Sequence, residues 1–296
     1  MSMQPGIWWL ASYPKSGNTW LRTVLTILVS GKPLDINDMG SLGVMGGLRF
    51  AFDDALGINT ADLSFEEEAN LRPRVYEIWA AEAARPLYCK VHDACHLTPS
   101  GEPLFPVTAT RGAVYVVRDP RAVAVSFAHH GSRPIDEVIA LMDAPAAAMA
   151  ASPRRLMRSL RGRLLRWSGH VESWLNAPFP VHLLRYEDMK TDPHAAFAGV
   201  ARFLDLPCTS EAIAAAVDAT TFSRLQARER EVGFSEKPWN STAFFREGTI
   251  DGWRRSLTPE QAMRITASHG AVMRRLGYDV TLTPFAAEQQ DLVDAR

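Results

Sequence analysis

Cysteine is scarce in this chain. Only three occur in 296 residues, Cys89, Cys95 and Cys208, and an odd number cannot pair fully within one chain. A reduced compartment is therefore expected, because small secreted domains rely on paired cysteines. Net charge is nearly absent as well, at −1. Such a balance creates no global field that would attract nucleic acid or an anionic membrane, so any polyanion must be bound by local groups.

Long apolar runs are also absent. The N-terminus has neither the basic region nor the apolar stretch of a signal peptide. Other apolar segments are interrupted by charge or glycine before the roughly 20 residues that a membrane span requires. The sequence predicts a cytoplasmic protein with no membrane span and no nucleic-acid partner, and it indicates no oligomeric state. With 47% hydrophobic residues, residues 1–296 are expected to form one domain.

Strand and helix patterns alternate along the chain without an internal repeat. Continuous apolar segments predict strands at residues 7–11, 86–92, 112–118 and 181–186. Helices are expected at residues 21–29, 64–84, 120–130, 156–174, 193–204, 210–219, 222–230 and 258–276. This alternation is typical of an α/β fold with a central, mostly parallel sheet flanked by helices.

Segments without such a pattern are expected to shape a second binding site. Residues 32–63 combine glycine with apolar residues, which favours an acceptor-site wall or lid, with partial disorder as the alternative. Residues 132–155 are assigned the same role, and residues 280–296 form a C-terminal tail. A solvated face explains the six arginines between positions 154 and 166 better than a nucleic-acid patch, because no aromatic residues are interleaved with them.

Residues 13–20, Tyr-Pro-Lys-Ser-Gly-Asn-Thr-Trp, join the first predicted strand to the first predicted helix. A small-residue turn at a helix start directs backbone N–H groups and the positive end of the helix dipole toward an anion. Lys15 adds a mobile cation. The turn is not a Walker A loop, because the lysine precedes the glycine. The sequence therefore predicts a phosphate site here.

This octapeptide resembles the 5′-phosphosulfate loop of the cytosolic-type sulfotransferases, which transfer a sulfuryl group from 3′-phosphoadenosine-5′-phosphosulfate (PAPS). The family pattern is Tyr-Pro-Lys-Ser-Gly-Thr-Thr-Trp, and here Asn18 offers a side-chain amide in place of the first threonine. The resemblance implies a P-loop NTPase-like nucleotide site that binds PAPS and releases adenosine 3′,5′-bisphosphate (PAP). Its loop residues would be Lys15, Ser16, Gly17, Asn18, Thr19 and Trp20.

Two later segments resemble the family's 3′-phosphate site. In residues 116–126, the family's arginine at a strand end and serine in the next helix correspond to Arg118 and Ser126. An arginine presents a planar fork of donors to phosphate oxygens. In residues 245–254, Arg246 and Gly248 match the family's Arg-Lys-Gly. Glu247 replaces the cation between them, so we predict that Glu247→Lys tightens nucleotide binding.

Aromatic residues complete the nucleotide site that the resemblance implies. Tyr186 begins Tyr-Glu-Asp-Met-Lys, a recurrent family sequence, and Thr221 and Phe222 belong to a segment resembling the family's Thr-Ser-Phe around the base. Trp20 offers a face for stacking. The alternative for each aromatic residue alone is ordinary core packing.

The catalytic residues are also implied by the resemblance. Lys15 would neutralise the charge on the leaving phosphate. His92 would be the general base, since Lys90-Val91-His92 resembles the family's Lys-Thr-His and histidine titrates near neutral pH. Lys90 would reach the acceptor and the sulfuryl group, and Ser126 would hold Lys15 away until the acceptor arrives. His129 and His130 follow Ser126 and receive no role.

Other chemistries remain as alternatives. Cys89, His92, Cys95 and His96 are candidate zinc ligands, but an extended segment would place the cysteines and histidines on opposite sides, so no metal is expected. An ATP-dependent small-molecule kinase would share the anion site, yet it has no use for a second phosphate site. A non-catalytic adenosine-bisphosphate-binding protein is the third possibility. The acceptor is expected to be a small hydrophobic alcohol, phenol or amine, and the arginines leave an acidic acceptor open.

Overall fold

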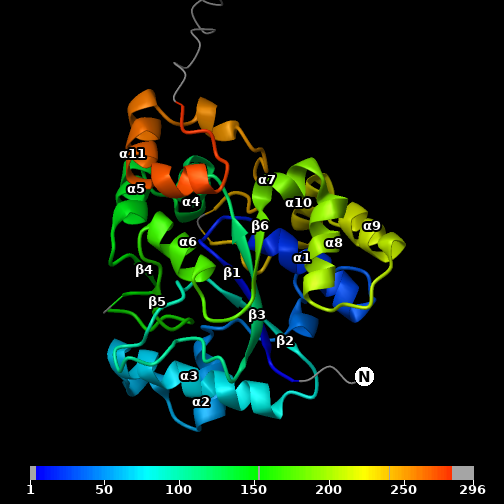
Figure 1. Ribbon diagram of the computed structural model, residues 1–296, viewed down its shortest axis with the longest axis vertical. Coiled ribbons are helices and arrows are strands. Elements are labelled where there is room, and N and C mark those ends of the chain that lie inside the picture. The colour runs from blue at the N-terminus through cyan, green and yellow to red at the C-terminus, as the bar shows by residue number, and fades with distance from the viewer. Residues whose placement is uncertain (1–4, 153, 240, 282–296) are drawn as a thin grey trace, which may run out of the picture.

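The computed structural model describes residues 5–152, 154–239 and 241–281. At its centre lies a four-stranded sheet in the order β2-β1-β3-β6, and all three strand pairs are parallel. The strands are β1 (Ile7–Ser12), β2 (Leu87–Val91), β3 (Thr110–Val117) and β6 (Val181–Arg185). Helices flank the sheet on both sides (Figure 1). The α/β fold with a central parallel sheet is confirmed.

Strand β1 shows how the sheet is buried on both faces. All six of its residues are buried. Ile7 and Trp9 pack into one hydrophobic cluster, whereas Trp8 and Leu10 pack into another. Because alternate side chains point to opposite faces, an unbroken apolar run is what this position requires.

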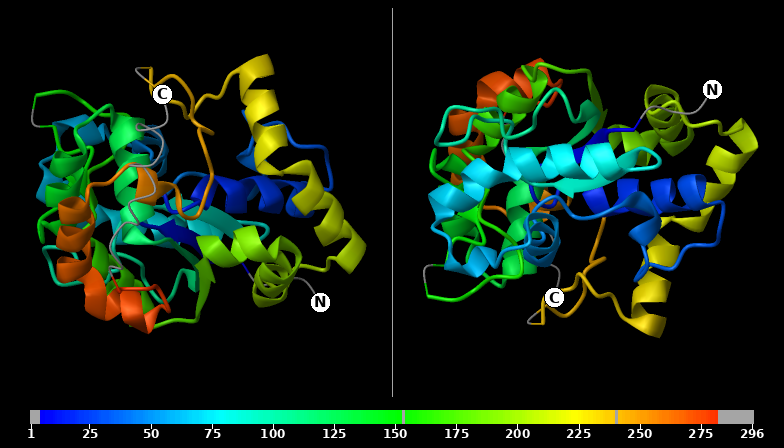
Figure 2. Two further views of the ribbon diagram at one scale, coloured as in Figure 1. Left: turned by 90° about the horizontal axis from the view of Figure 1, so that it is seen from above. Right: turned by 90° about the horizontal axis from the view of Figure 1, so that it is seen from below.

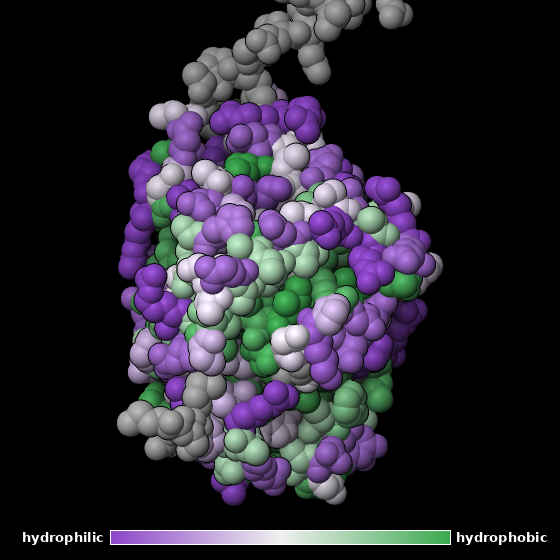
Figure 3. Space-filling model, turned by 90° about the vertical axis from the view of Figure 1, so that its right-hand side faces the viewer, coloured by the Kyte–Doolittle hydropathy of each residue, from purple (hydrophilic) through white to green (hydrophobic). Residues whose placement is uncertain are grey.

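Two groups of helices form these clusters with the sheet. On the side of Trp8 lie α1 (Asn18–Ser30), α8 (Pro193–Phe203) and α9 (Ser210–Ala219). On the side of Trp9 lie α3 (Phe65–Glu82), α4 (Pro120–Gly131), α5 (Ile135–Asp143), α6 (Trp167–Leu175) and α11 (Pro259–Arg275). On the face shown in Figure 3, the side of α8 and α9 in Figure 1, apolar residues gather in the middle with hydrophilic residues around them.

The remaining elements are three helices, a short strand pair and three 3₁₀ turns among the described residues. They are α2 (Arg49–Leu56), α7 (Tyr186–Thr191), α10 (Phe222–Val232), the antiparallel pair of β4 (Ala148–Met149) and β5 (Gly162–Arg163), and the 3₁₀ turns η1 (Gly40–Leu42), η2 (Thr60–Asp62) and η3 (Gly252–Arg255). After α10 the chain returns toward the middle of the molecule as a long loop, in yellow-orange in Figure 2. Of the predicted tail, residues 282–296 lie outside the described residues.

The predicted helix over residues 156–174 is wrong in its first half. Helix α6 begins only at Trp167, and Leu165 before it has a positive φ of 59°. Leu160 and Leu164 are buried at helical spacing, but their N–H groups donate to the carbonyl groups of Gly47 and Ala147. The apolar spacing therefore reflects burial of an irregular segment against distant parts of the chain.

Residues 32–63 are more ordered than a flexible lid, because they contain α2 and two 3₁₀ turns. Residues 45–49 form a parallel bridge to β2 and an antiparallel bridge to residues 157–160. The Leu160 N–H donates to Gly47 at 2.8 Å, and the Arg49 N–H donates to Arg158 at 2.9 Å. We call residues 45–49 and 157–160 the edge pair, since they extend the β2 edge of the sheet.

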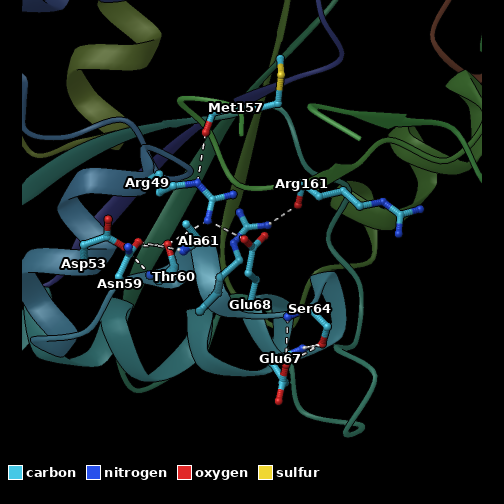
Figure 4. Close-up of polar contacts among 11 residues, drawn as sticks. Arg49, Asp53, Asn59, Thr60, Ala61, Ser64, Glu67, Glu68, Met157 and Arg161 are labelled. Carbon is cyan, nitrogen blue, oxygen red and sulfur yellow. Dashed lines mark hydrogen bonds and ion pairs between the residues drawn. The ribbon is translucent and has the colours of Figure 1, made fainter. Parts of the chain in front are cut away.

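Two buried arginines hold the edge pair in place. Arg49 donates to the carbonyl group of Met157 at 3.1 Å and pairs with Glu68 of α3 (Figure 4). Arg72 pairs with Asp93 at 2.8 Å and donates to the carbonyl groups of Gly46 and Arg161. Both arginines thus bind backbone oxygens of segments that would otherwise be irregular loops.

Candidate active site

A cavity of about 680 Å³ opens at the carboxyl ends of all four central strands. This is the place where open α/β sheets bind ligands. Most of the site residues predicted from the sequence line it. They are Lys15, Gly17, Asn18, Thr19, Trp20, Lys90, His92, Arg118, Ser126, Tyr186, Phe222, Arg246 and Gly248. The lining does not include Ser16, which is fully buried, or Thr221, which precedes α10.

The turn after β1 has the geometry of an anion site. Lys15 and Gly17 have positive φ values of 69° and 110°, and α1 starts directly after Gly17. A Cβ atom on Gly17 would lie 2.7 Å from Cδ2 of Tyr186, so the turn requires glycine on steric grounds as well. The first N–H groups of a helix have no partner within it. Here the residues that carry them, Asn18 and Thr19, line the cavity.

The side-chain amide of Asn18, predicted to contact the anion, is engaged within the protein in this structure. Its amide nitrogen donates to the carbonyl group of Leu10 at 2.8 Å and to the Ser12 hydroxyl at 3.3 Å. The side chain therefore ties the turn to β1 rather than facing a ligand. Only the backbone N–H of Asn18 remains for the phosphate site.

Lys15 contacts a histidine that the sequence did not assign. Its Nζ lies 3.1 Å from Nδ1 of His130 and 4.2 Å from the centre of the Phe244 ring. Burial, with Lys90 and Arg118 nearby, lowers the pKa of Lys15 to about 7. Burial and Lys15 lower the pKa of His130 to about 4, so neutral His130 accepts a hydrogen bond from the Lys15 ammonium. Ser126 lines the cavity one helical turn earlier, and its predicted role stays a prediction.

His92 lies at the end of β2 with one ring nitrogen engaged. Nδ1 is 2.9 Å from the carbonyl oxygen of Ser12. A carbonyl oxygen can only accept, so Nδ1 carries the proton and Nε2 keeps a free lone pair. Burial lowers the pKa of His92 to about 3, with Lys90 acting in the same direction. At neutral pH the ring is therefore uncharged, with Nε2 unprotonated, as a general base must be.

Lys90 pairs with a carboxylate that the sequence analysis missed. Glu236, in the loop after α10, binds Lys90 at 2.8 Å and Arg22 of α1 at 2.6 Å. Burial raises the pKa of Glu236, but Lys90 and Arg22 outweigh this and hold it at about 2. These partners lie 146 and 214 positions away in the sequence, so no local pattern indicated the contact.

The other end of the cavity is built around Arg118. Its guanidinium lies 4.2 Å from the centre of the Tyr186 ring and donates to the carbonyl group of Thr249 at 2.9 Å. The Tyr186 hydroxyl donates to the carbonyl group of Gly248 at 2.9 Å. A Cβ atom on Gly248 would lie 2.5 Å from the Phe222 ring. Arg118 after β3 and Tyr186 at the start of α7 are thus both bound to the loop before η3. The sequence analysis predicted both residues for the nucleotide site.

Glu247 also lines the cavity, next to Arg246. Its carboxylate binds Arg246 at 2.8 Å, and both side chains are about one-third exposed, at 38% and 36%. The Glu247 carboxylate therefore neutralises part of the positive charge of Arg246, the residue that the sequence predicts to bind the 3′-phosphate.

The half of the cavity next to the edge pair is apolar. The apolar lining there includes Met45, Val91, Phe127, Met149, Leu156, Met157 and Leu160. Phe244 and Phe245 line the cavity from the loop after α10, where they pack against Phe234. Of the described residues in the two predicted acceptor segments, those at 45, 47, 149 and 150 line the cavity, whereas α5 packs against α4 and α11.

Two further chemical features concern metal and membrane. Within residues 5–152, 154–239 and 241–281, no three His, Cys, Asp or Glu side chains gather closely enough to bind a metal ion. None of the helices in those ranges is both long and apolar enough to cross a bilayer.

Comparison with known proteins places this geometry in context. A family model described as the sulfotransferase domain matches residues 94–277, more than half of the chain. Cytosolic sulfotransferase 1 of Arabidopsis thaliana is 24% identical over 275 residues, covering 86% of this chain and 75% of that protein. The amine sulfotransferase of Oryctolagus cuniculus is 26% identical over 159 residues, covering 51% and 50%.

Solved structures share the fold. The crystal structure of retinol dehydratase with retinol and PAP has a TM-score of 0.60 at 20% identity, covering 96% of this chain and 85% of that one. A mouse sulfotransferase complexed with PAP has a TM-score of 0.58 at 18% identity, covering 93% and 87%. The family match begins after the turn at residues 13–20, so that turn is an independent observation.

Proposed function

From the premise that the chain belongs to the sulfotransferase domain family, we propose that it transfers the sulfuryl group of PAPS to a hydroxyl or amine of a small, hydrophobic acceptor. One observation carries the proposal. A single cavity contains a helix-start anion site with Lys15, a second cationic end with Arg118, and a histidine with a free Nε2.

The two ends of the cavity fit the two phosphate groups of the donor. The turn before α1 and Lys15 would bind the 5′-phosphosulfate, whereas Arg118, Ser126 and Arg246 would bind the 3′-phosphate. Phe222 and Trp20 lie in the lining and would stack on the adenine. Relatives crystallised with PAP support this assignment.

The transfer step needs little covalent work from the protein. His92 Nε2 takes the proton from the acceptor hydroxyl or amine as that atom attacks sulfur in line. The bond between sulfur and the bridging phosphate oxygen breaks, and Lys15 neutralises the charge that develops on this oxygen. Lys90 would bind the sulfuryl oxygens. The proton ends on His92 and the sulfuryl group on the acceptor, so the reaction balances without a metal or redox partner.

The apolar half of the cavity supports a hydrophobic acceptor. A thioether and aromatic lining adapts to irregular apolar shapes, and it begins beside His92, where the reacting atom must lie. The relatives named cytosolic sulfotransferases support a cytoplasmic location, and those named for an amine or for retinol act on small molecules of this kind.

Calorimetry with PAP and with AMP, which lacks the 3′-phosphate, tests the donor site. We expect at least tenfold tighter binding of PAP, because a charged hydrogen bond contributes about 1.5–3 kcal/mol. Sulfuryl transfer from PAPS to a panel of hydrophobic phenols, alcohols and amines would then test the reaction. Equal affinity for PAP and AMP would favour the kinase, and PAP binding without transfer would favour the non-catalytic protein.

A further inference from the structure

Glu236 is a carboxylate that lines the cavity beside Lys90. Its two oxygens bind two cations from different elements, Arg22 of α1 at 2.6 Å and Lys90 of β2 at 2.8 Å. The three side chains are mostly buried, with 9%, 16% and 19% exposure for Arg22, Lys90 and Glu236. None of these contacts is a solvated surface pair, so each is only weakly screened.

The loop that carries Glu236 is held at several other points. Asn37 binds the backbone of Ser235 at 2.7 Å and of Gly233 at 3.3 Å. Glu229 of α10 accepts from the N–H groups of Phe244 and Phe245. The loop would therefore keep its course over the cavity without Glu236. What this carboxylate adds is charge beside Lys90.

Lys90 needs that charge because its surroundings oppose it. Burial lowers the pKa of Lys90, and Arg22 acts in the same direction, whereas Glu236 raises it. The same carboxylate raises the pKa of Lys15 and His130, although burial keeps both low. A buried amine without a counter-ion loses its proton instead of remaining charged.

We propose that Glu236 is a positioning residue for sulfuryl transfer, which holds Lys90 as a charged ammonium facing the reacting group. The proposal rests on the proposed function. Glu236 does not replace His92 as the base, because both of its oxygens already accept charged hydrogen bonds. It acts through Lys90, and its removal should affect turnover more than donor binding.

The first test compares Glu236→Gln, Lys90→Met and the double variant. We expect kcat to fall about 10- to 100-fold in each single variant, because each removes one stabilising charge from the transition state. The double variant should be no slower than Lys90→Met, and the Kd of PAP should change less than about twofold in all three. Glu231→Gln is the control, since Glu231 lies exposed on α10 and pairs with Arg228.

Two outcomes would overturn the proposal. One is unchanged turnover of Glu236→Gln. The other is an equal loss when Glu236→Gln is introduced into the Lys90→Met background, because the carboxylate would then act independently of Lys90. If Glu236→Gln does not fold, Glu236→Asp gives the same comparison, since the shorter side chain withdraws the carboxylate from Lys90 and keeps its charge.

A second measurement does not depend on transfer activity. Acetic anhydride modifies neutral amines, and peptide mass spectrometry can report the labelling rate of Lys90 against exposed Lys32 as an internal reference. We expect Glu236→Gln to raise the relative rate for Lys90 several-fold, because the amine loses its counter-ion. An unchanged rate would contradict the proposal even if the protein transferred no sulfuryl group, whereas a raised rate in an inactive protein would contradict only the proposed function.

Discussion

At the residue scale, the site depends on side chains whose protonation is shifted by burial. Lys15 and His92 line one cavity, and burial lowers the pKa of the lysine to about 7 and of the histidine to about 3. The same desolvation thus leaves the proposed base free to accept a proton and makes the proposed cation sensitive to pH near neutrality.

His92→Ala should separate catalysis from binding. We expect transfer to fall about 100- to 10,000-fold, as is typical for loss of a general base. PAP affinity should stay within about twofold, measured by calorimetry. His129→Ala is the matched control, because His129 is exposed on α4 and does not line the cavity. Transfer that survives in His92→Ala would refute the assignment of the base.

The pKa of Lys15 predicts how PAP affinity depends on pH. Since the pKa is lowered to about 7, the charge is present below this value and lost above it. Affinity should therefore fall about tenfold for each pH unit above the pKa. Lys15→Arg stays charged throughout this range, so calorimetry across it should show a smaller change. A fall of the same size in Lys15→Arg would assign the titration to another group.

Glu247→Lys should tighten the binding of PAP. The substitution removes the carboxylate that pairs with Arg246 and adds a cation, and we expect about two- to fivefold because the pair is partly exposed. Glu231→Lys makes the same charge change on α10, away from the cavity, and controls for long-range effects. Weaker or unchanged affinity of Glu247→Lys would show that the carboxylate does not oppose the 3′-phosphate.

Sequence reasoning at this scale succeeds where neighbours along the chain act together. Lys15 and Gly17 belong to one turn, so their shared cavity could be predicted from the octapeptide. The direction of the Asn18 side chain could not, because it depends on where Leu10 lies in the folded strand. Glu236 and His130 were missed for the same reason, since their partners are distant in the sequence.

At the element scale, local chemistry predicts helix ends well. The helix expected from residue 64 begins with a capping box at Ser64, in which the Glu67 carboxylate accepts from the Ser64 N–H at 2.8 Å. All four central strands were predicted, because a sheet buried on both faces leaves continuous apolar runs. The helix expected over 156–174 failed because apolar spacing alone does not distinguish a helix from an irregular segment buried on one side.

Ser64→Ala should lower the free energy of unfolding by about 1 kcal/mol. The substitution removes the side-chain acceptor of the Glu67 N–H at the start of an 18-residue helix. Chemical denaturation measures the change. Ser210→Ala is the control, because Ser210 is the first residue of α9, whose cap is Thr209. Equal effects of the two substitutions would contradict a specific contribution of the capping box.

At the scale of the whole molecule, buried arginines connect segments that are far apart in sequence. Arg72 of α3 pairs with Asp93 beyond β2, with side chains only 3% and 8% exposed. Arg72 also donates to the carbonyl group of Gly46 in the edge pair and to that of Arg161, the residue after it. No sequence pattern predicts such a connection, because each partner alone resembles an ordinary surface charge.

Arg72→Met should destabilise the fold by about 3–5 kcal/mol, since it leaves Asp93 buried without its cation. Arg74→Met is the matched control, because Arg74 lies two residues further along α3. Arg74 is 68% exposed and meets Glu77 at 3.5 Å, so its loss should change stability by less than about 1 kcal/mol. Chemical denaturation measures both changes. Equal losses of unfolding free energy in the two variants would show that the buried ion pair stabilises the fold no more than a surface ion pair does.

The edge pair has a consequence for how this enzyme can diverge. Arg49 and Arg72 bind its backbone carbonyl groups at Met157 and Gly46, so the course of these segments depends on the two arginines and not on the side chains of Met45 and Met157. Met45 and Met157 can therefore be replaced through ordinary mutation while the phosphate turn and His92 stay untouched. Random libraries at these two positions should yield folded descendants with new acceptor preferences far more often than libraries in the donor half.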